Sequence, residues 1–216
     1  MKKTIILCLL SVMYAQAGVV ISNPAGVPAE NVVISQPDHS GSSVVQARNR
    51  ASNLSDWRAI TQTFYWNTDA QFDGIGFYMG AGNDLYWTEG ASQTYVLVIQ
   101  KLSANEPEST VLTAEFQLTA DKVTDNQWIY FDTENVALEN GQLYGLSLCP
   151  EEYSVNSVLR TFWATGSEGF MLEGIARQYA PNMPDAIPKS DSYSLGGGIN
   201  GYAFYMQSVP GSLRCR

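Results

Sequence analysis

Short runs in which apolar and polar side chains alternate are the feature that most constrains the fold of this chain. In the clearest run, residues 111–118, the apolar side chains of Leu112, Ala114, Phe116 and Leu118 share one face. A period of two residues is that of a half-buried β-strand, and no window of a dozen residues has convincing α-helical periodicity. The sequence therefore predicts an all-β fold.

Short runs of β-branched and aromatic residues recur along the chain, and Asn140-Gly141 between two of them is typical of a turn. The predicted strands are Asn31–Ser35, Ser43–Ala47, Ala59–Trp66, Phe72–Met79, Thr94–Lys101, Thr110–Leu118, Gln127–Asp132, Leu143–Leu148, Val158–Trp163 and Tyr202–Ser208. Residues 168–180 are the best candidate for a short helical or irregular piece. Many short strands without intervening helices predict a two-sheet antiparallel jelly-roll β-sandwich over residues 30–208.

The first 17 residues have the pattern of a secretory signal peptide. Lys2 and Lys3 precede an apolar run over residues 5–14, and Ala15-Gln16-Ala17 supplies small residues for cleavage after Ala17. The run is shorter than the roughly 20 residues of a membrane-spanning helix. We therefore expect a secreted or cell-surface protein with an N-terminal linker at 18–29 and a tail at 209–216.

The charge balance bears on the partners of the protein. The chain has 12 Lys and Arg against 21 Asp and Glu, a formal net charge of −9, and the acids are scattered singly. Nucleic acids and anionic membrane surfaces are bound by clustered Lys and Arg. The sequence thus predicts no nucleic-acid partner and no binding to anionic membrane surfaces. Because it holds no apolar run long enough to span a bilayer, it also predicts no stable membrane insertion.

The cysteines leave two alternatives open. Cys8 belongs to the predicted signal peptide, so Cys149 and Cys215 would remain in the mature chain. An oxidising compartment permits a disulfide between them, but a cysteine at the penultimate position needs no partner.

The sequence offers little for catalysis. His39 is the single histidine, in a polar loop, and no Gly-x-Ser-x-Gly motif presents a nucleophile. Glu115 stands alone on the polar face of its strand, whereas a glycosidase needs two carboxyl groups across a groove. We predict no catalytic residue and a protein that is not an enzyme.

Metal binding is limited by the supply of ligands. One histidine and two distant cysteines do not build a zinc site. Oxygen ligands suffice for calcium, and Asn83-Asp84, Asp121 and Asp125-Asn126 are candidates. We expect no cofactor, and a structural calcium is the alternative that the sequence leaves open.

Aromatic residues are the best candidates for binding. Trp66 and Trp128 lie on predicted strands and are expected in the core. Two long insertions between strands are predicted, at Gly80–Ser92 and Thr165–Asn200. The first contains Tyr86 and Trp87, and Trp163 shortly precedes the second. Loops on a rigid sandwich are where binding usually resides. The predicted carbohydrate-binding residues are Tyr86, Trp87, Arg160 and Trp163.

Several segments together resemble a known family. They are Ile-Thr-Gln-Thr-Phe at 60–64, Phe-Asp-Gly-Ile-Gly-Phe-Tyr at 72–78, residues 95–99, residues 128–132 and residues 138–146. The order resembles that of jelly-roll modules of anchor-bearing bacterial surface proteins, including passengers of the exosortase (PEP-CTERM) system. The likeness covers about residues 55–148, with a plausible last strand at Tyr202–Ser208, and brings no catalytic residue.

The end of the chain departs from that family. Its passengers end in a Val-Pro-Glu-Pro-like signal, an apolar helix and an Arg-rich tail, whereas here Gly211 follows Ser208-Val209-Pro210 and no apolar helix comes after it. Either the anchor is lost, or Val-Pro is a coincidence. In both cases we expect release.

The function expected from the sequence is that of a non-catalytic exported β-sandwich module. Its partner would be a glycan or cell-surface polysaccharide bound at the loop aromatics. The alternatives are a carbohydrate-active enzyme that uses paired carboxylates and a purely structural or adhesive surface protein.

Overall fold

The computed structural model describes residues 18–49, 60–80, 90, 92–103, 106–123, 126–150, 157–164, 176–178 and 202–210. The predicted signal peptide, most of both insertions and the chain from residue 211 onward lie outside these ranges. Among the described residues the one helical piece is a 3-10 turn, η2 (Ala120–Lys122). None of them forms a helix long and apolar enough to cross a membrane.

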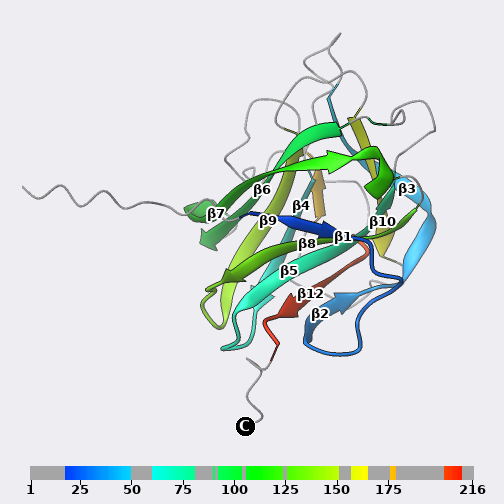
Figure 1. The fold of residues 1–216 in the computed structure, drawn as a ribbon. Helices are drawn as coiled ribbons and strands as arrows, with labels where there is room; N and C mark the ends of the chain where they lie inside the picture. The colour runs from blue at the N-terminus through cyan, green and yellow to red at the C-terminus, as the bar shows by residue number, and fades with distance from the viewer. Residues whose placement is uncertain are drawn as a thin grey trace, which may run out of the picture.

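The described chain is built almost entirely of β-strands, which confirms the predicted fold class (Figure 1). The strands are β1 (Val20–Ser22), β2 (Val32–Gln36), β3 (His39–Asn49), β4 (Ile60–Trp66), β5 (Phe72–Gly80), β6 (Ser92–Ser103), β7 (Glu106–Thr119), β8 (Gln127–Val136), β9 (Gln142–Pro150), β10 (Ser157–Ala164), β11 (Ala176–Gln178) and β12 (Phe204–Ser208).

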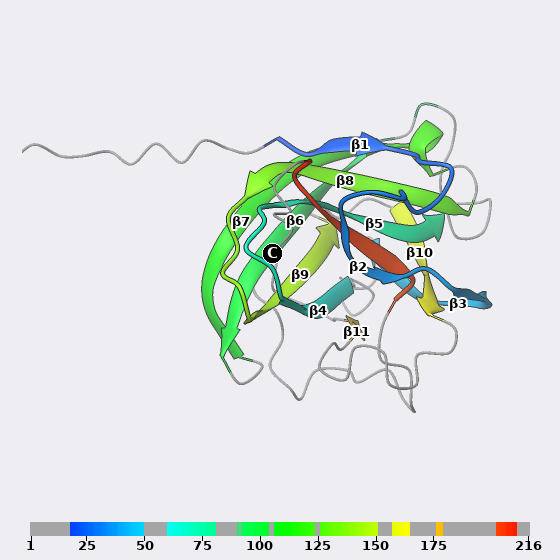
Figure 2. The same ribbon diagram turned by 90° about the horizontal axis from the view of Figure 1, so that it is seen from below.

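The strands pair as one long hairpin folded over on itself. β6 pairs with β7, β5 with β8, β4 with β9, β3 with β10 and β2 with β12, every pair antiparallel. The nested pairs divide between a seven-stranded sheet, β1-β8-β5-β10-β3 with β12 and β2, and a five-stranded sheet, β11-β4-β9-β6-β7 (Figure 2). This is the predicted two-sheet jelly-roll sandwich.

The main core lies between the sheets and follows the period of two. Ile75, Phe77 and Met79 of β5 point inward, and Leu97 and Ile99 of β6 face them from the other sheet. All five are at most 1% exposed. Alternating apolar residues on both sheets therefore form the core that the sequence predicts.

The two tryptophans expected in the core are buried in different places. Trp66 is fully buried between the sheets, and its Nε1 donates to the Ala70 carbonyl at 2.9 Å. Trp128 is 7% exposed and belongs to a second cluster with Tyr130 and Tyr205. This outer aromatic cluster lies on the outer face of the seven-stranded sheet, because the residues that alternate with it, such as Phe131, face the core.

An N-terminal strap, residues 23–31, crosses the outer aromatic cluster between β1 and β2. Asn23 Nδ2 donates to the carbonyls of Lys122 at 3.0 Å and Trp128 at 3.3 Å. At the other end, the Ser208 N–H donates to the Asn31 carbonyl at 2.8 Å. β1 lies in the segment expected to be a linker, and β11 lies in the piece expected to be helical or irregular, so both strands correct the predictions made from the sequence.

Candidate functional site

An open hollow of about 370 Å³ lies at one end of the five-stranded sheet. The core includes Phe64 and Trp66 of β4 and Tyr144 of β9. Because side chains alternate along a strand, their neighbours Tyr65 and Leu143 face outward. We call this the outer-face hollow. Its lining residues are Tyr65, Leu102, Ser103, Glu108, Gly141, Gln142 and Leu143.

The base of the hollow is apolar. Tyr65 on β4 pairs in register with Leu143 on β9, and the Lys101–Tyr144 pair places Leu102 of β6 on the other side of Leu143. Leu102 and Leu143 are buried, and the partly buried ring of Tyr65 packs against them. Three neighbouring strands thus present one aromatic ring beside a small aliphatic floor.

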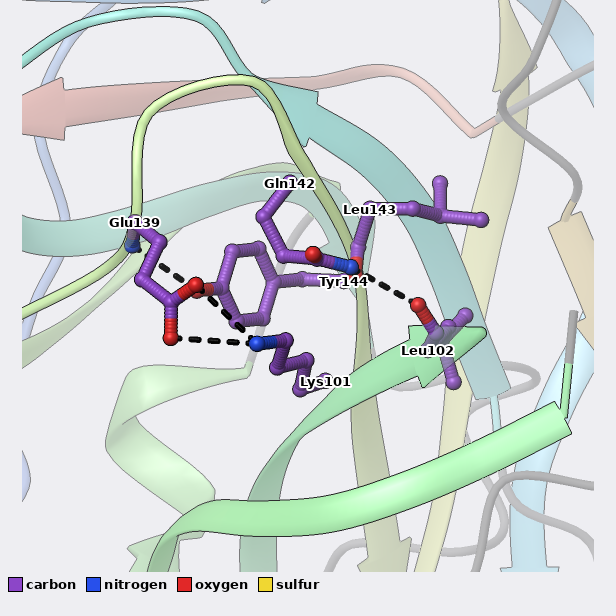
Figure 3. Close-up of polar contacts among 6 residues, drawn as sticks. All are labelled: Lys101, Leu102, Glu139, Gln142, Leu143 and Tyr144. Atoms are coloured by element: carbon purple, nitrogen blue, oxygen red, sulfur yellow. Dashed lines mark hydrogen bonds and ion pairs between the residues drawn. The ribbon is translucent and has the colours of Figure 1, made fainter. Parts of the chain in front are cut away.

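The rim of the hollow is polar. Gln142 Nε2 donates to the main-chain carbonyls of Leu102 at 2.7 Å and Leu143 at 3.1 Å, which ties β9 to β6 (Figure 3). With both amide hydrogens in use, the Oε1 atom of Gln142 is left as a hydrogen-bond acceptor. The exposed side chains of Ser103 and Glu108 complete the rim. The rim is therefore rich in acceptors.

A tight turn holds the rim in place. Gly141 has a φ of 77°, a left-handed conformation that glycine adopts without strain, as expected for the predicted Asn140-Gly141 turn. Its N–H donates to the Trp66 carbonyl at 2.7 Å, and Asn140 Nδ2 donates to Asp69 Oδ1 at 2.9 Å. The turn is thereby tied to the connection that follows β4.

An ion pair lies next to the hollow (Figure 3). Lys101 Nζ lies 3.1 and 3.0 Å from the two carboxylate oxygens of Glu139, whose N–H donates to the Tyr144 hydroxyl at 2.8 Å. The hydrogen bond to Glu139 is the main cause that raises the pKa of Lys101. Among the residues that line the hollow, Glu108 is the one with a charged side chain, and its charge also helps to raise the pKa of Lys101.

The side chains of the four predicted carbohydrate-binding residues all lie outside the described part of the structure. Tyr86 and Trp87 lie outside the described residues. Arg160 and Trp163 lie on β10, whose main chain is described while these two side chains are not. Arg160 pairs with Gly80, which ends β5 and begins the predicted first insertion.

The metal and disulfide predictions are not decided by the described residues. Asp121 and Asn126 are exposed, while Asn83, Asp84 and Asp125 lie outside the described ranges. Within those ranges no group of three or more His, Cys, Asp or Glu is placed to hold a metal ion. Cys149 is the second-last residue of β9, and its side chain is not described. Cys215 lies outside the described ranges.

His39 begins β3 and packs against aromatic rings. The exposed imidazole stacks on Tyr78 with a centroid distance of 3.7 Å and meets the edge of Phe162 at 5.9 Å. Its Nδ1 lies 3.3 Å from the Pro37 carbonyl. These contacts give the histidine a packing role at the end of the outer aromatic cluster.

A buried tyrosine and two carboxyl groups lie on the outer face of the seven-stranded sheet. The Tyr130 hydroxyl donates to Asp73 Oδ2 at 2.8 Å, and Asp132 Oδ1 accepts from the Glu134 N–H at 3.0 Å. Burial is the main cause that raises the pKa of Asp73, and the charge of Asp132 adds to it. Neither carboxyl group lines the outer-face hollow.

None of the residues that line the hollow was among the predicted binding residues. One signal was present, because the alternation of Phe64, Tyr65 and Trp66 puts the middle ring on the outer face.

No known protein family and no curated protein matches the chain.

Proposed function

We propose that the protein is a non-catalytic, exported β-sandwich module that binds carbohydrate at the outer-face hollow. The observation that carries this proposal is the partly buried ring of Tyr65 beside an aliphatic floor and an acceptor-rich rim. A sugar ring offers C–H groups that pack on an aromatic face and hydroxyl donors that suit the acceptors of Gln142 and Glu108. About 370 Å³ also lies within the usual 300–1,000 Å³ of small-ligand sites.

The rim favours binding over hydrolysis. Glu108 is the one carboxylate among the residues that line the hollow. Glycoside hydrolysis ordinarily needs two carboxyl groups about 5–9.5 Å apart, one on each side of the scissile bond. The Glu139 carboxylate next to the hollow is paired with Lys101, which leaves Glu108 to accept hydrogen bonds from a bound sugar.

The loop aromatics Tyr86 and Trp87, with Arg160 and Trp163, form a second proposed contact. The pairing of Arg160 with Gly80 supports it, because the first insertion leaves β5 beside β10. Gly80 ends β5, whereas Phe72 begins it close to the end that carries the hollow. The main chain of Gly80 and Arg160 therefore lies away from the hollow, and the two proposed contacts can be tested separately.

The test is a glycan array probed with purified protein, with and without EDTA. We expect binding to a defined glycan, reduced at least about tenfold by Tyr65→Ala, because truncation of a central aromatic contact ordinarily costs more than about 1.4 kcal/mol. Val111→Ala, an exposed change on β7, is the matched control and should bind like the unchanged protein.

Three outcomes separate the alternatives. Loss of binding in Trp87→Ala but not in Tyr65→Ala would move the site to the insertions. Release of soluble sugar from a polysaccharide would identify an enzyme instead. An array without any signal would favour a purely structural or adhesive role.

Export is tested independently. Processing after Ala17 predicts that the protein recovered outside the cell begins at Gly18. N-terminal sequencing of the secreted protein checks this, and an intact Met1 would contradict it.

A further inference from the structure

The turn of Asn140 and Gly141 beside the outer-face hollow has a chemical reactivity that its structural role does not use. Both residues are exposed, and Gly141 lines the hollow. In an Asn-Gly pair the main-chain nitrogen of the glycine attacks the asparagine amide with little hindrance, because glycine has no Cβ. The sequence holds one further such pair, Asn200-Gly201, which lies outside the described residues.

The reaction converts the side-chain amide to a carboxylate and consumes one water molecule. The Gly141 nitrogen gives its proton to hydroxide and bonds to Asn140 Cγ, while the bond from Cγ to Nδ2 breaks and ammonia leaves with a proton taken from water. The product is a five-membered cyclic imide, which water opens at either of its two carbonyl carbons. One opening gives aspartate. The other gives isoaspartate, in which the main chain runs through the former side chain and is one carbon longer.

Two hydrogen bonds hold the turn away from this reaction. The Gly141 N–H donates to the Trp66 carbonyl at 2.7 Å, so the proton that the attacking nitrogen has to lose is engaged. Asn140 Nδ2 donates to Asp69 Oδ1 at 2.9 Å, which fixes the amide that is attacked. Both bonds break when the turn opens locally, while the core between the sheets stays packed. The fold therefore sets the rate of the reaction through the opening of the turn.

The products of the reaction do not fit the same contacts. A carboxylate at position 140 has no hydrogen to donate and faces the carboxylate of Asp69, so the attraction between the two side chains becomes a repulsion. In the isoaspartyl product the extra carbon also shifts Gly141 relative to the Trp66 carbonyl. Gly141 and its neighbour Gln142 both line the hollow. The change at position 140 therefore acts on the rim.

We propose that Asn140 is a site of spontaneous modification, at which conversion to aspartate or isoaspartate releases the turn and loosens the rim of the outer-face hollow. Because the reaction needs only water and time, glycan binding declines as the exported protein ages. The effect on glycan binding rests on the proposed function, whereas the conversion and the release of the turn do not.

The first experiment measures conversion at Asn140 by peptide mapping and mass spectrometry after incubation at mildly alkaline pH. Native protein should gain a carboxylate at this residue, more slowly than the chain unfolded in urea, and Asn200 is read from a separate peptide. Asp69→Ala should speed conversion of the native protein roughly two- to tenfold, the change in the opening equilibrium for one lost hydrogen bond, and leave the rate in urea unchanged. Glu115→Ala removes an exposed carboxylate on β7 and is the matched control, which should convert like the unchanged protein.

The second experiment exchanges the two side chains. Asn140→Asp reproduces one product and should lower the folding equilibrium constant about two- to fivefold in urea unfolding, because two exposed carboxylates then face each other. Adding Asp69→Asn returns one amide and one carboxylate to the contact and should restore most of this loss, and Asp69→Asn alone completes the double-mutant cycle. On the glycan array, Asn140→Asp should bind more weakly than the unchanged protein, and the exchanged pair should bind like the unchanged protein.

Conversion at Asn140 that is absent from the native protein, or as fast there as in urea, would overturn the proposal. A loss of stability in Asn140→Asp that Asp69→Asn does not repair would overturn the release of the turn. If Asn140→Asp binds a glycan as well as the unchanged protein does, the link to the hollow is wrong. An array on which the unchanged protein binds nothing contradicts the proposed function, and the mass and unfolding measurements then decide the modification and the release of the turn by themselves.

Discussion

Gly74 and Gly76 on β5 each lie beneath a tyrosine ring. A Cβ atom at Gly74 would collide with Tyr130, and one at Gly76 would collide with Tyr205. The two rings stack with centroids 5.7 Å apart and an interplanar angle of 6°. The absence of side chains at the two glycines lets the outer aromatic cluster lie flat on the sheet, where the N-terminal strap covers it.

Gly76→Ala should therefore destabilise the protein. The added methyl group has to displace the fully buried ring of Tyr205, and overpacking of this kind typically costs about 1–3 kcal/mol. Gly26→Ala is the matched control, since a Cβ there meets nothing within 4 Å. In urea unfolding, Gly76→Ala should lower the free energy of unfolding clearly and Gly26→Ala should leave it nearly unchanged. Equal losses in the two variants would contradict the packing described.

Asp73 should make stability depend on pH. Its pKa is raised above 3.8, so the native state holds the proton more tightly than the unfolded chain does. Its contribution is then fully present below about pH 3.8 and is lost as the pH rises through the native pKa. Asp73→Asn removes this loss while its amide oxygen still accepts from Tyr130. As the pH rises from about 3 to about 7, the free energy of unfolding of Asp73→Asn should increase relative to that of the unchanged protein, as urea unfolding can measure. A difference that stays constant with pH would contradict the assignment.

At the scale of elements, one side chain ties β9 to the end of β6. Gln142 Nε2 donates to two main-chain carbonyls, and Gln142→Leu leaves the Leu102 carbonyl without this donor. We expect a loss of about 1–3 kcal/mol in unfolding free energy, together with weaker glycan binding. Gln117→Leu is the control, because Gln117 is exposed and donates to the Thr94 hydroxyl. A similar loss in both variants would argue against the tie.

The elements that sequence reasoning recovered are those with enough length to show a period of two. The ten predicted strands correspond to β2–β10 and β12, whereas β1 and β11 have three residues each, too few to display alternation. The hollow was missed for a different reason. Alternation indicates that Tyr65 faces away from Phe64 and Trp66, but which side chains of β6 and β9 lie beside it depends on register between distant strands.

At the scale of the whole molecule, the nested pairing makes the sandwich depend on contacts between the two ends of the chain. β2 and β12 pair across nearly the full length of the described chain, while β6 and β7 form the innermost hairpin. Non-local pairing of this kind favours slow folding, because loop-closure entropy is lost before the contacts form. Central strands then share the stability of the whole fold, and short edge strands open locally.

Amide hydrogen exchange should display this order directly. β9 pairs with β4 on one side and β6 on the other, and Leu146 and Leu148 are fully buried. Their amides should exchange only through global unfolding. β1 makes three pairs with β8, and Val20 is 56% exposed, so its amides should exchange through local opening at a much lower free energy. Mild urea should accelerate exchange in β9 and leave β1 nearly unchanged, because global unfolding exposes far more surface than fraying does. Equal protection in β1 and β9 would mean that the N-terminal strand is an integral part of the cooperative unit and would contradict the expected order.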